Sequence, residues 1–231
     1  MTHVNIMAGG PQACLPAAWE QLPGVWIGVD RGTLRLVRAG IHPELAVGDF
    51  DSLTLEELRL VRGHVQKLQQ VPSEKDDTDT ELAVKAALQA SSSGDVTLVG
   101  GTGGRLDHFL SNLFLPLQPR FLADVERLHL FDVQNWVDYY SPGEHEIKPL
   151  PGYRYVAVVN LTPVADLTIV GAKYPLKPWR AGYPYVWASN EFLDVWASNE
   201  FLGKQPFTVS WTTGQVAIIY SRDRRGQKLD N

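Results

Sequence analysis

Acidic and glycine-rich stretches recur along the first half of the chain, with residue types that could bind a phosphorylated ligand. They are residues 48–52, 75–79 and 100–108. The first and third follow apolar runs typical of β-strands, and the second leads into a helical pattern. Carboxylates gathered in one place repel each other unless a divalent cation holds them together. The pattern therefore indicates a site for a metal-bound polyphosphate.

Polar residues and glycines directly follow several apolar runs. In open α/β sheets, ligands bind beyond the carboxyl ends of the strands. We therefore expect one ligand-binding edge of a sheet, formed by the residues that follow these runs: Gly9, Gly10, Asp30, Asp49 and Gly100.

The acidic residues have the types and spacing of a magnesium site. Asp49 and Asp51 are two apart, so in an extended segment their side chains point the same way and could share one cation. Oxygen ligands of this kind suit Mg²⁺, which keeps several waters and is completed by substrate phosphates. Asp79 lies near a predicted helix N-terminus. Lys75 could meet a phosphate or remain solvated.

The glycine-rich stretch is suited to binding a phosphate. It offers backbone N–H groups and the Arg105 guanidinium at the start of a helix. It is not a P-loop, because no Gly-Lys-Ser/Thr follows. Asp107, within the first helical turn, could add a metal or water ligand. His108 could act as a base, but its apolar neighbours favour a structural role.

Strands and helices alternate over the first 140 or so residues. We expect strands at residues 4–7, 25–29, 45–47, 65–71, 96–99 and 128–131. Capping-box spacing predicts helices after Thr54 and Thr78, and apolar residues three and four apart predict another over 106–114. The alternation predicts an N-terminal domain, residues 1–140, built on an open parallel α/β sheet.

The character of the chain changes after residues 141–152, a segment rich in turn formers that suggests a boundary. Beyond it we expect strands at residues 153–161, 167–170, 207–211 and 216–220, with a hairpin turn at 212–215. The pattern predicts a small C-terminal all-β sandwich over residues 150–223.

One segment of the C-terminal part is duplicated. Residues 186–193 recur as 195–202, a period of nine. Two copies are too few for a solenoid. A strand cannot absorb an odd number of extra residues without reversing which face its side chains occupy, so one copy must leave the sandwich. We expect residues 186–194 to be displaced, because the second copy continues into the strand at 207–211.

Composition limits the class of protein. The net charge of −5 over 231 residues argues against a nucleic-acid surface. A single cysteine, Cys14, rules out an intramolecular disulfide and fits a reducing compartment. No apolar run approaches the ~18 residues that span a bilayer. We expect a cytoplasmic protein with neither a nucleic-acid nor a membrane partner.

Taken in this order, the motifs resemble those of the thiamine pyrophosphokinase family. The matching segments are residues 29–32, 48–52, 75–83, 103–108 and 171–176, followed by the Ser-Asn-Glu-Phe motif. The resemblance covers nearly the whole chain. It implies a MgATP-binding α/β domain and a thiamine-binding sandwich in a homodimer, with thiamine between the α/β domain of one subunit and the sandwich of the other. The implied reaction transfers pyrophosphate from ATP to the thiamine hydroxyl and releases AMP.

The resemblance also implies roles for particular residues. Mg²⁺ and the polyphosphate would be organised by Asp49, Asp51 and Asp79. Arg105 would neutralise developing charge, and Asp107 would complete the acidic site. ATP binding would involve Asp30, Lys75, Gly103 and Gly104. Of the duplicated pairs we expect Ser198 and Asn199 to bind thiamine, because they join directly onto a strand whose register must be kept.

Other functions remain open on the sequence. A pyrophosphokinase acting on a pterin-type alcohol would share the acidic and Gly-Arg motifs and differ in its acceptor site. A nucleotide-binding sensor without turnover is a further alternative, although binding alone would not require so many like charges. Release of AMP from ATP only when thiamine is added would separate these possibilities.

Overall fold

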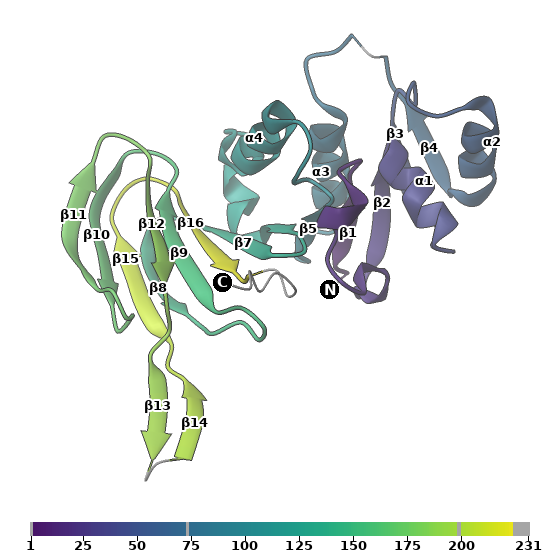
Figure 1. Ribbon diagram of the computed structural model, residues 1–231. Coiled ribbons are helices and arrows are strands. Elements are labelled where there is room, and N and C mark those ends of the chain that lie inside the picture. Colours follow the sequence, from purple (N-terminus) through teal and green to yellow (C-terminus); the bar gives the residue numbers. More distant parts are fainter. Residues whose placement is uncertain (1, 73, 198–199, 224–231) are drawn as a thin grey trace, which may run out of the picture. The chain divides into compact units, whose positions relative to one another are not determined.

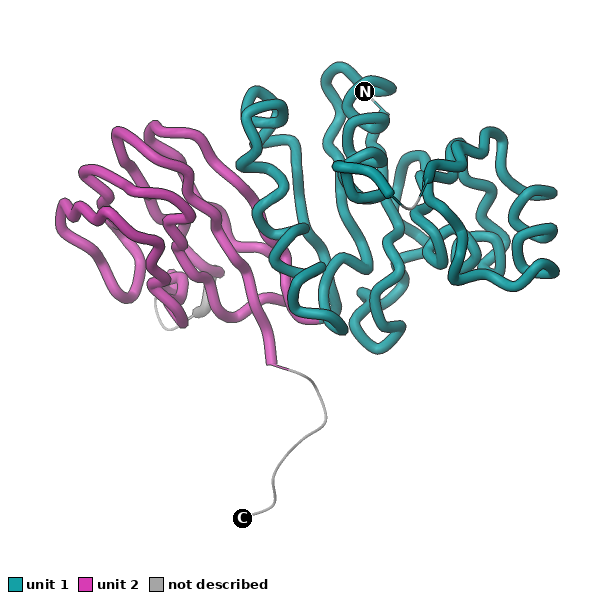
Figure 2. Tube along the Cα trace, turned by 90° about the horizontal axis from the view of Figure 1, so that it is seen from above, with its two compact units in different colours: residues 1–133 teal, residues 134–231 magenta. Residues whose placement is uncertain are grey.

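The computed structural model describes residues 2–72, 74–197 and 200–223 (Figure 1). The chain forms two compact units, the first spanning Met1–Val133 and the second Gln134–Asn231 (Figure 2). The division falls earlier than the boundary expected between 1–140 and 150–223. The reason is that strands β7 (Asn135–Tyr140) and β8 (Gly143–Ile147) already belong to the second unit.

The first unit is built on a parallel sheet. Its strand order is β6-β5-β1-β2-β3-β4, with bounds β1 Val4–Met7, β2 Val25–Val29, β3 Leu45–Gly48, β4 Lys67–Gln70, β5 Val96–Val99 and β6 Leu128–Phe131. All residues of β1 and β5 are buried, as in central strands covered on both faces. The predicted open parallel α/β sheet is confirmed.

Helices cover this sheet (Figure 1): α1 (Arg31–Arg38), α2 (Leu55–His64), α3 (Asp79–Ala90) and α4 (Leu106–Phe114). The capping boxes predicted for α2 and α3 are present, at Thr54 with Glu57 and at Thr78 with Glu81. Helix α1 was not predicted. Within the described residues, no helix combines the length and apolarity needed to cross a membrane.

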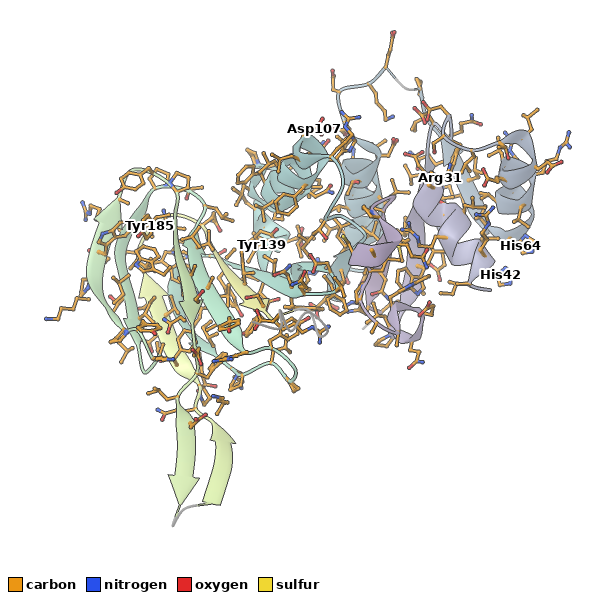
Figure 3. The ribbon with its side chains drawn as sticks, in the orientation of Figure 1. Arg31, His42, His64, Asp107, Tyr139 and Tyr185 are labelled. Carbon is orange, nitrogen blue, oxygen red and sulfur yellow. The ribbon has the colours of Figure 1, made fainter. Side chains whose placement is uncertain are left out.

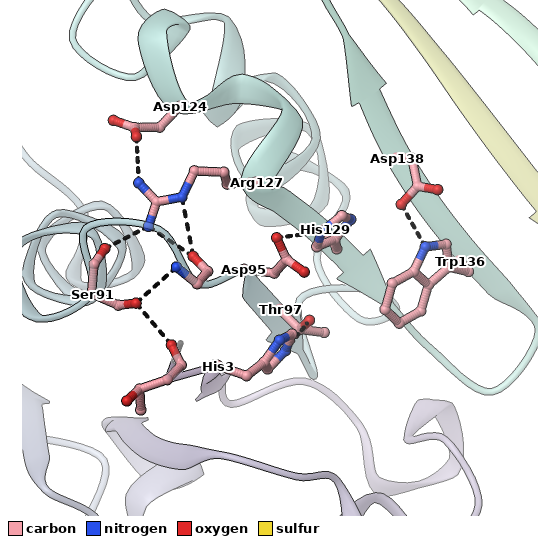
Figure 4. A network of polar contacts seen from close by, with 11 residues as sticks. His3, Ser91, Asp95, Thr97, Asp124, Arg127, His129, Trp136 and Asp138 are labelled. Atoms are coloured by element: carbon pink, nitrogen blue, oxygen red, sulfur yellow. Dashed lines mark hydrogen bonds and ion pairs between the residues drawn. The ribbon is translucent and has the colours of Figure 1, made fainter. Parts of the chain in front are cut away.

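A polar network ties together the amino-terminal ends of the central strands (Figure 4). Arg127, just before β6, donates to the carboxylate of Asp124 and to the carbonyls of Ser91 and Gly94. The Ser91 hydroxyl donates to the carbonyl of Thr2, just before β1. These contacts fix the end of the sheet that lies opposite the carboxyl edge.

The second unit is an antiparallel sandwich, as predicted. One sheet has the order β12-β9-β16-β7, and the other has the order β11-β10-β15-β8. The further strands are β9 Tyr155–Asn160, β10 Val164–Val170, β11 Leu176–Ala181, β12 Tyr185–Asn190, β15 Phe207–Trp211 and β16 Val216–Ser221. Side chains of both sheets share one buried core that includes Val158, Ile169, Val209 and Ile218.

Residues 212–215 connect β15 and β16 from one sheet to the other. β15 pairs with β10 and β8, whereas β16 pairs with β7 and β9. The predicted hairpin between these strands is therefore wrong. Both strands direct buried side chains into the same core, so they face each other across the sandwich instead of pairing.

The duplicated copies take different positions in the second unit. The first copy forms most of β12, which pairs with β9, and its Phe192 is buried in the core. The second copy contributes to β13 (Asp194–Ala197) and β14 (Glu200–Lys204), which form a separate two-stranded sheet. The expectation that residues 186–194 leave the sandwich is wrong.

Contacts outside the repeat explain why the first copy occupies the sheet. Tyr185, which precedes only the first copy, packs against Trp179 with ring centroids 5.7 Å apart. The side chain of Asn160 donates to the carbonyl of Tyr183 in the preceding turn. A hairpin inserted between β12 and β15 leaves the register of both strands unchanged, and a longer loop costs little free energy.

Candidate active site

The carboxyl ends of neighbouring strands in the first unit bring the candidate residues to one edge. Asp30 directly follows β2, Asp49 directly follows β3, and Gly100 directly follows β5. The strand order reverses between β1 and β5, the position at which open α/β sheets bind ligands. In the view of Figure 3, Arg31 and Asp107 lie towards the upper end of this unit.

Asp30 lies in the acidic part of this edge. Its backbone has φ +44°, an uncommon value for a residue with a side chain. Its Oδ1 accepts a hydrogen bond from the backbone N–H of Phe50 at 3.2 Å. A Cβ added at Gly48 would come within 1.9 Å of the same oxygen, so only glycine fits there. The hydrogen bond from Phe50 and the close approach of Gly48 thus hold the loop after β3 against the side chain of Asp30.

Three carboxylates influence one another at this edge. The pKa of Asp30 is raised to about 7, mainly by burial, then by the charge of Asp79 and, more weakly, by that of Asp49. The hydrogen bond from Phe50 opposes this shift. The neighbouring carboxylates thus add to burial in disfavouring the charged form of Asp30.

Lys75 and Asp79 lie together at the start of α3. Lys75 Nζ is 3.0 Å from Asp79 Oδ1, and both side chains are largely buried. The contact is close enough for an ion pair but off the direction of a hydrogen bond, and none of the described groups donates a hydrogen bond to this oxygen. Asp79 thus retains a buried acceptor that a cation or its water could use.

The loop after β3 is not extended. Phe50 is buried and has φ +59°, and Asp49 Oδ1 accepts a hydrogen bond from the backbone N–H of Asp51 at 3.1 Å. Residues 49–51 therefore form a tight turn. The condition of an extended segment, under which Asp49 and Asp51 would point the same way, is therefore not met, and Asp51 is exposed.

The glycine-rich loop leads into α4. Gly100, Gly103 and Gly104 have φ between +72° and +74°, the left-handed region that glycine tolerates. Arg105 and Asp107 form an ion pair with N···O 2.5 Å, and both are exposed. The hydrogen bond from Arg105 lowers the pKa of Asp107 to about 2. In this arrangement Asp107 compensates Arg105.

Among the described residues, no three His, Cys, Asp or Glu side chains are grouped closely enough to hold a metal ion by themselves. The arrangement still suits Mg²⁺, which typically takes one or two carboxylates and completes its shell with water and substrate phosphates. Asp79 Oδ1 accepts no hydrogen bond from the described residues and has only Lys75 close to it among the ion pairs described, and Asp30 and Asp49 supply the neighbouring charge.

In the second unit, the Ser-Asn pair of the first copy is firmly held. The Asn190 amide accepts from the N–H groups of Tyr174 and Glu191 and donates to the Tyr174 carbonyl, at 2.8–3.0 Å. Asn190 is 2% exposed, and Ser189 next to it has φ +58°. The pair thus joins the Gly171–Leu176 motif to β12. Ser198 and Asn199 lie outside the described residues.

Sequence reasoning missed Arg31 and Arg35 on α1. Both donate to backbone carbonyls of the loops at the carboxyl edge. The signal available in the sequence was their spacing of four, which places both on one helix face.

A parallel α/β unit with acidic and glycine-rich loops at its carboxyl edge defines a phosphate-binding α/β protein, here followed by an antiparallel sandwich. Comparisons with known proteins agree and are more specific. The family model described as thiamin pyrophosphokinase, catalytic domain, matches residues 16–124, and the one described as thiamin pyrophosphokinase, vitamin B1 binding domain, matches residues 144–216.

Individual relatives show the same likeness. A thiamine pyrophosphokinase from Bacillus subtilis is 38% identical over 179 residues, which cover 76% of this chain and 82% of the relative. The structure of a thiamin pyrophosphokinase family protein from Enterococcus faecalis has a TM-score of 0.87 and 39% identity, covering 96% of this chain and 100% of the other. The Bacillus subtilis enzyme structure has a TM-score of 0.80 and 33% identity, with coverage of 96% and 100%. The chain belongs to the thiamine pyrophosphokinase family.

Proposed function

We propose that this chain transfers the terminal pyrophosphate of ATP to the hydroxyl of thiamine, giving thiamine diphosphate and AMP. The observation that carries the proposal is the match of each family domain to its own structural unit. The catalytic-domain match, residues 16–124, lies within the first unit, and the vitamin B1-binding match, residues 144–216, lies within the second.

ATP would bind at the carboxyl edge of the first unit. The N–H groups around Gly103 and Gly104 would receive phosphate oxygens, and Lys75 would add a positive charge next to Asp79. Arg105 is exposed and pairs with Asp107 beside it. Its guanidinium can exchange that carboxylate for the phosphate oxygens that gain charge as the β-phosphorus is attacked.

Asp49, Asp51 and Asp79 would hold Mg²⁺, with Asp30 as the neighbouring carboxylate. When bound, Mg²⁺ would neutralise part of the negative charge of the phosphates. The residues themselves would orient the polyphosphate, because phosphoryl-type transfer depends on positioning and electrostatics more than on covalent chemistry by the protein. The raised pKa of Asp30 supports this in part: burial is its largest cause, and the charges of Asp79 and Asp49, which a cation would offset, add to it.

For thiamine binding, the structure of the second unit favours the first copy of the repeat over Ser198 and Asn199. Asn190 would act by holding the loop at Tyr174 against β12, because its amide makes three hydrogen bonds to backbone groups. Ser189 beside it, with its left-handed backbone, would be the member of the pair that meets the ligand.

The product assay is the test of this function. AMP release from MgATP is measured by chromatography with thiamine, with a hydroxymethylpterin and with no acceptor. We expect AMP only with thiamine, in equal amount to thiamine diphosphate. AMP release with the pterin alcohol alone would favour the alternative pyrophosphokinase, and ATP binding without any release would favour a sensor.

A homodimer and a cytoplasmic location complete the proposal. No residue of α4, all of which the structure describes, is buried, and Leu106, Leu110 and Phe114 expose an apolar stripe four residues apart. A second copy of the chain would cover such a face. Sedimentation of the full chain measures its mass, and we expect the mass of two copies.

The proposed cytoplasmic location rests on the single cysteine of the sequence, which fits a reducing compartment.

A further inference from the structure

Helix α1 carries a half-buried arginine that the proposed chemistry does not use. Arg35 Nη1 donates to the Ala8 carbonyl at 3.1 Å, and Nη2 donates to the Gly10 carbonyl at 2.8 Å. Burial, with a smaller contribution from the charge of Arg31, lowers the pKa of Arg35. A guanidinium kept in such a place costs free energy, so its contacts call for a physical explanation.

The carbonyls to which Arg35 donates belong to the loop after β1. Backbone hydrogen bonds join this loop to the end of β5 and to the glycine-rich loop. The N–H of Gly10 donates to the Gly100 carbonyl at 2.9 Å, and the N–H of Ala8 donates to the Val99 carbonyl at 2.8 Å. Arg35, Gly10 and Gly100 thus form a chain of hydrogen bonds. It runs from α1 to the loop at the point where the strand order reverses between β1 and β5.

Arg31, one turn earlier on α1, makes the corresponding contact with the loop after β3. Its Nη1 donates to the Ser52 carbonyl at 2.7 Å. Residues four apart lie on the same face of a helix. One helix therefore binds the backbone of two loops at the carboxyl edge, through Arg31 on the acidic side and Arg35 on the glycine-rich side.

We infer that Arg35 is a positioning residue for polyphosphate binding, an inference that rests on the proposed function. Its planar fork donates to two carbonyls at once, which a lysine cannot reproduce. Carbonyl oxygens repel phosphate. Holding the Ala8 and Gly10 carbonyls against α1 keeps them away from the ligand. It also fixes the loop after β1, whose Gly10 N–H in turn holds the glycine-rich loop at the Gly100 carbonyl.

Kinetics of Arg35→Met, Arg35→Lys and Arg38→Met test this role. Arg38 ends the same helix and pairs with Glu57 at the surface, so it is the matched control. For Arg35→Met we expect the KM for MgATP to rise about 10- to 100-fold while the KM for thiamine stays within about twofold. Arg35→Lys should also raise the KM for MgATP and not the KM for thiamine, but by a smaller factor. It provides the test if the methionine variant does not fold. Arg38→Met should match the wild type.

The outcomes separate this inference from the proposed function. If the wild type shows no thiamine-dependent AMP release, the proposed function fails. If the wild type is active and both Arg35 variants keep the wild-type KM for MgATP, Arg35 does not position the loops and the inference is overturned. A lower melting temperature with both KM values unchanged would also overturn it, since that result describes a purely structural arginine.

Discussion

Asp49→Asn is expected to lower turnover by about 100- to 1,000-fold while leaving the fold intact. The carboxylate lies directly after β3, influences Asp30, and is proposed to hold Mg²⁺ against the polyphosphate. An amide keeps the size of the side chain and its acceptor for the Asp51 N–H. It removes the charge on which the cation depends. Steady-state kinetics over a range of Mg²⁺ concentrations would measure the loss, and the dependence on Mg²⁺ should weaken.

Asp76→Asn is the matched control, because Asp76 is an exposed acid just before α3. It should keep near-wild-type turnover. Wild-type turnover in Asp49→Asn, or an equal loss in both variants, would refute the assignment of Asp49.

The metal-free protein offers a readout of Asp49→Asn that does not depend on turnover. Because the folded chain raises the pKa of Asp30 to about 7, between about pH 4 and pH 7 the folded state keeps a proton that the unfolded chain has released. The free energy of unfolding therefore falls as pH rises through this window. In a chelator, the substitution should reduce this fall and raise the melting temperature near pH 8.

The second large effect is expected at the duplicated asparagines. Asn190→Ala leaves the backbone groups of Tyr174 and Glu191 without partners in a site that is 2% exposed at Asn190. We expect a loss of about 2–4 kcal/mol in the free energy of unfolding and a raised KM for thiamine. Asn199→Ala, the same substitution in the second copy, should change both quantities far less. Denaturant unfolding and thiamine kinetics of the two variants provide the comparison. The larger loss in Asn199→Ala would show that the second copy binds thiamine.

Deletion of one copy cannot replace this comparison. Because the copies are identical and adjacent, removing residues 186–194 or residues 194–202 produces the same shortened chain. This chain should retain turnover, since β12 and β15 keep their places and only the β13–β14 hairpin is lost.

The strands and helices that could be predicted from the sequence are those whose pattern lies within a few neighbouring residues. Residues 4–7 and 96–99 are continuous apolar runs, and they form the buried strands β1 and β5. Helix α1 was missed because its sequence mixes arginines with Gly32, and its burial comes from packing that the chain order does not reveal. The edge strand β11 was missed because its sequence is polar and contains Pro178. Proline interrupts a strand pattern and is tolerated only at the edge of a sheet.

The candidate site shows the same limit. Residues that follow strands could be placed at one edge, because parallel strands end together. The turn at Phe50 and the pairing of Arg105 with Asp107 depend on side-chain geometry, which residue spacing does not specify. The expectation that the first copy of the repeat leaves the sandwich was wrong because register with β15 was weighed alone. The contacts of Tyr185 and Tyr183 on the other side of the repeat decided it.

The fate of the β-phosphate of ATP tests the central claim most directly. The full-length protein is incubated with Mg²⁺, thiamine and ATP labelled in either the β- or the γ-phosphate, and the products are separated. The account predicts that both labels enter thiamine diphosphate equally and that AMP forms in the same amount, because attack falls on the β-phosphorus. Transfer of the γ-label alone, with ADP as the nucleotide product, would contradict it.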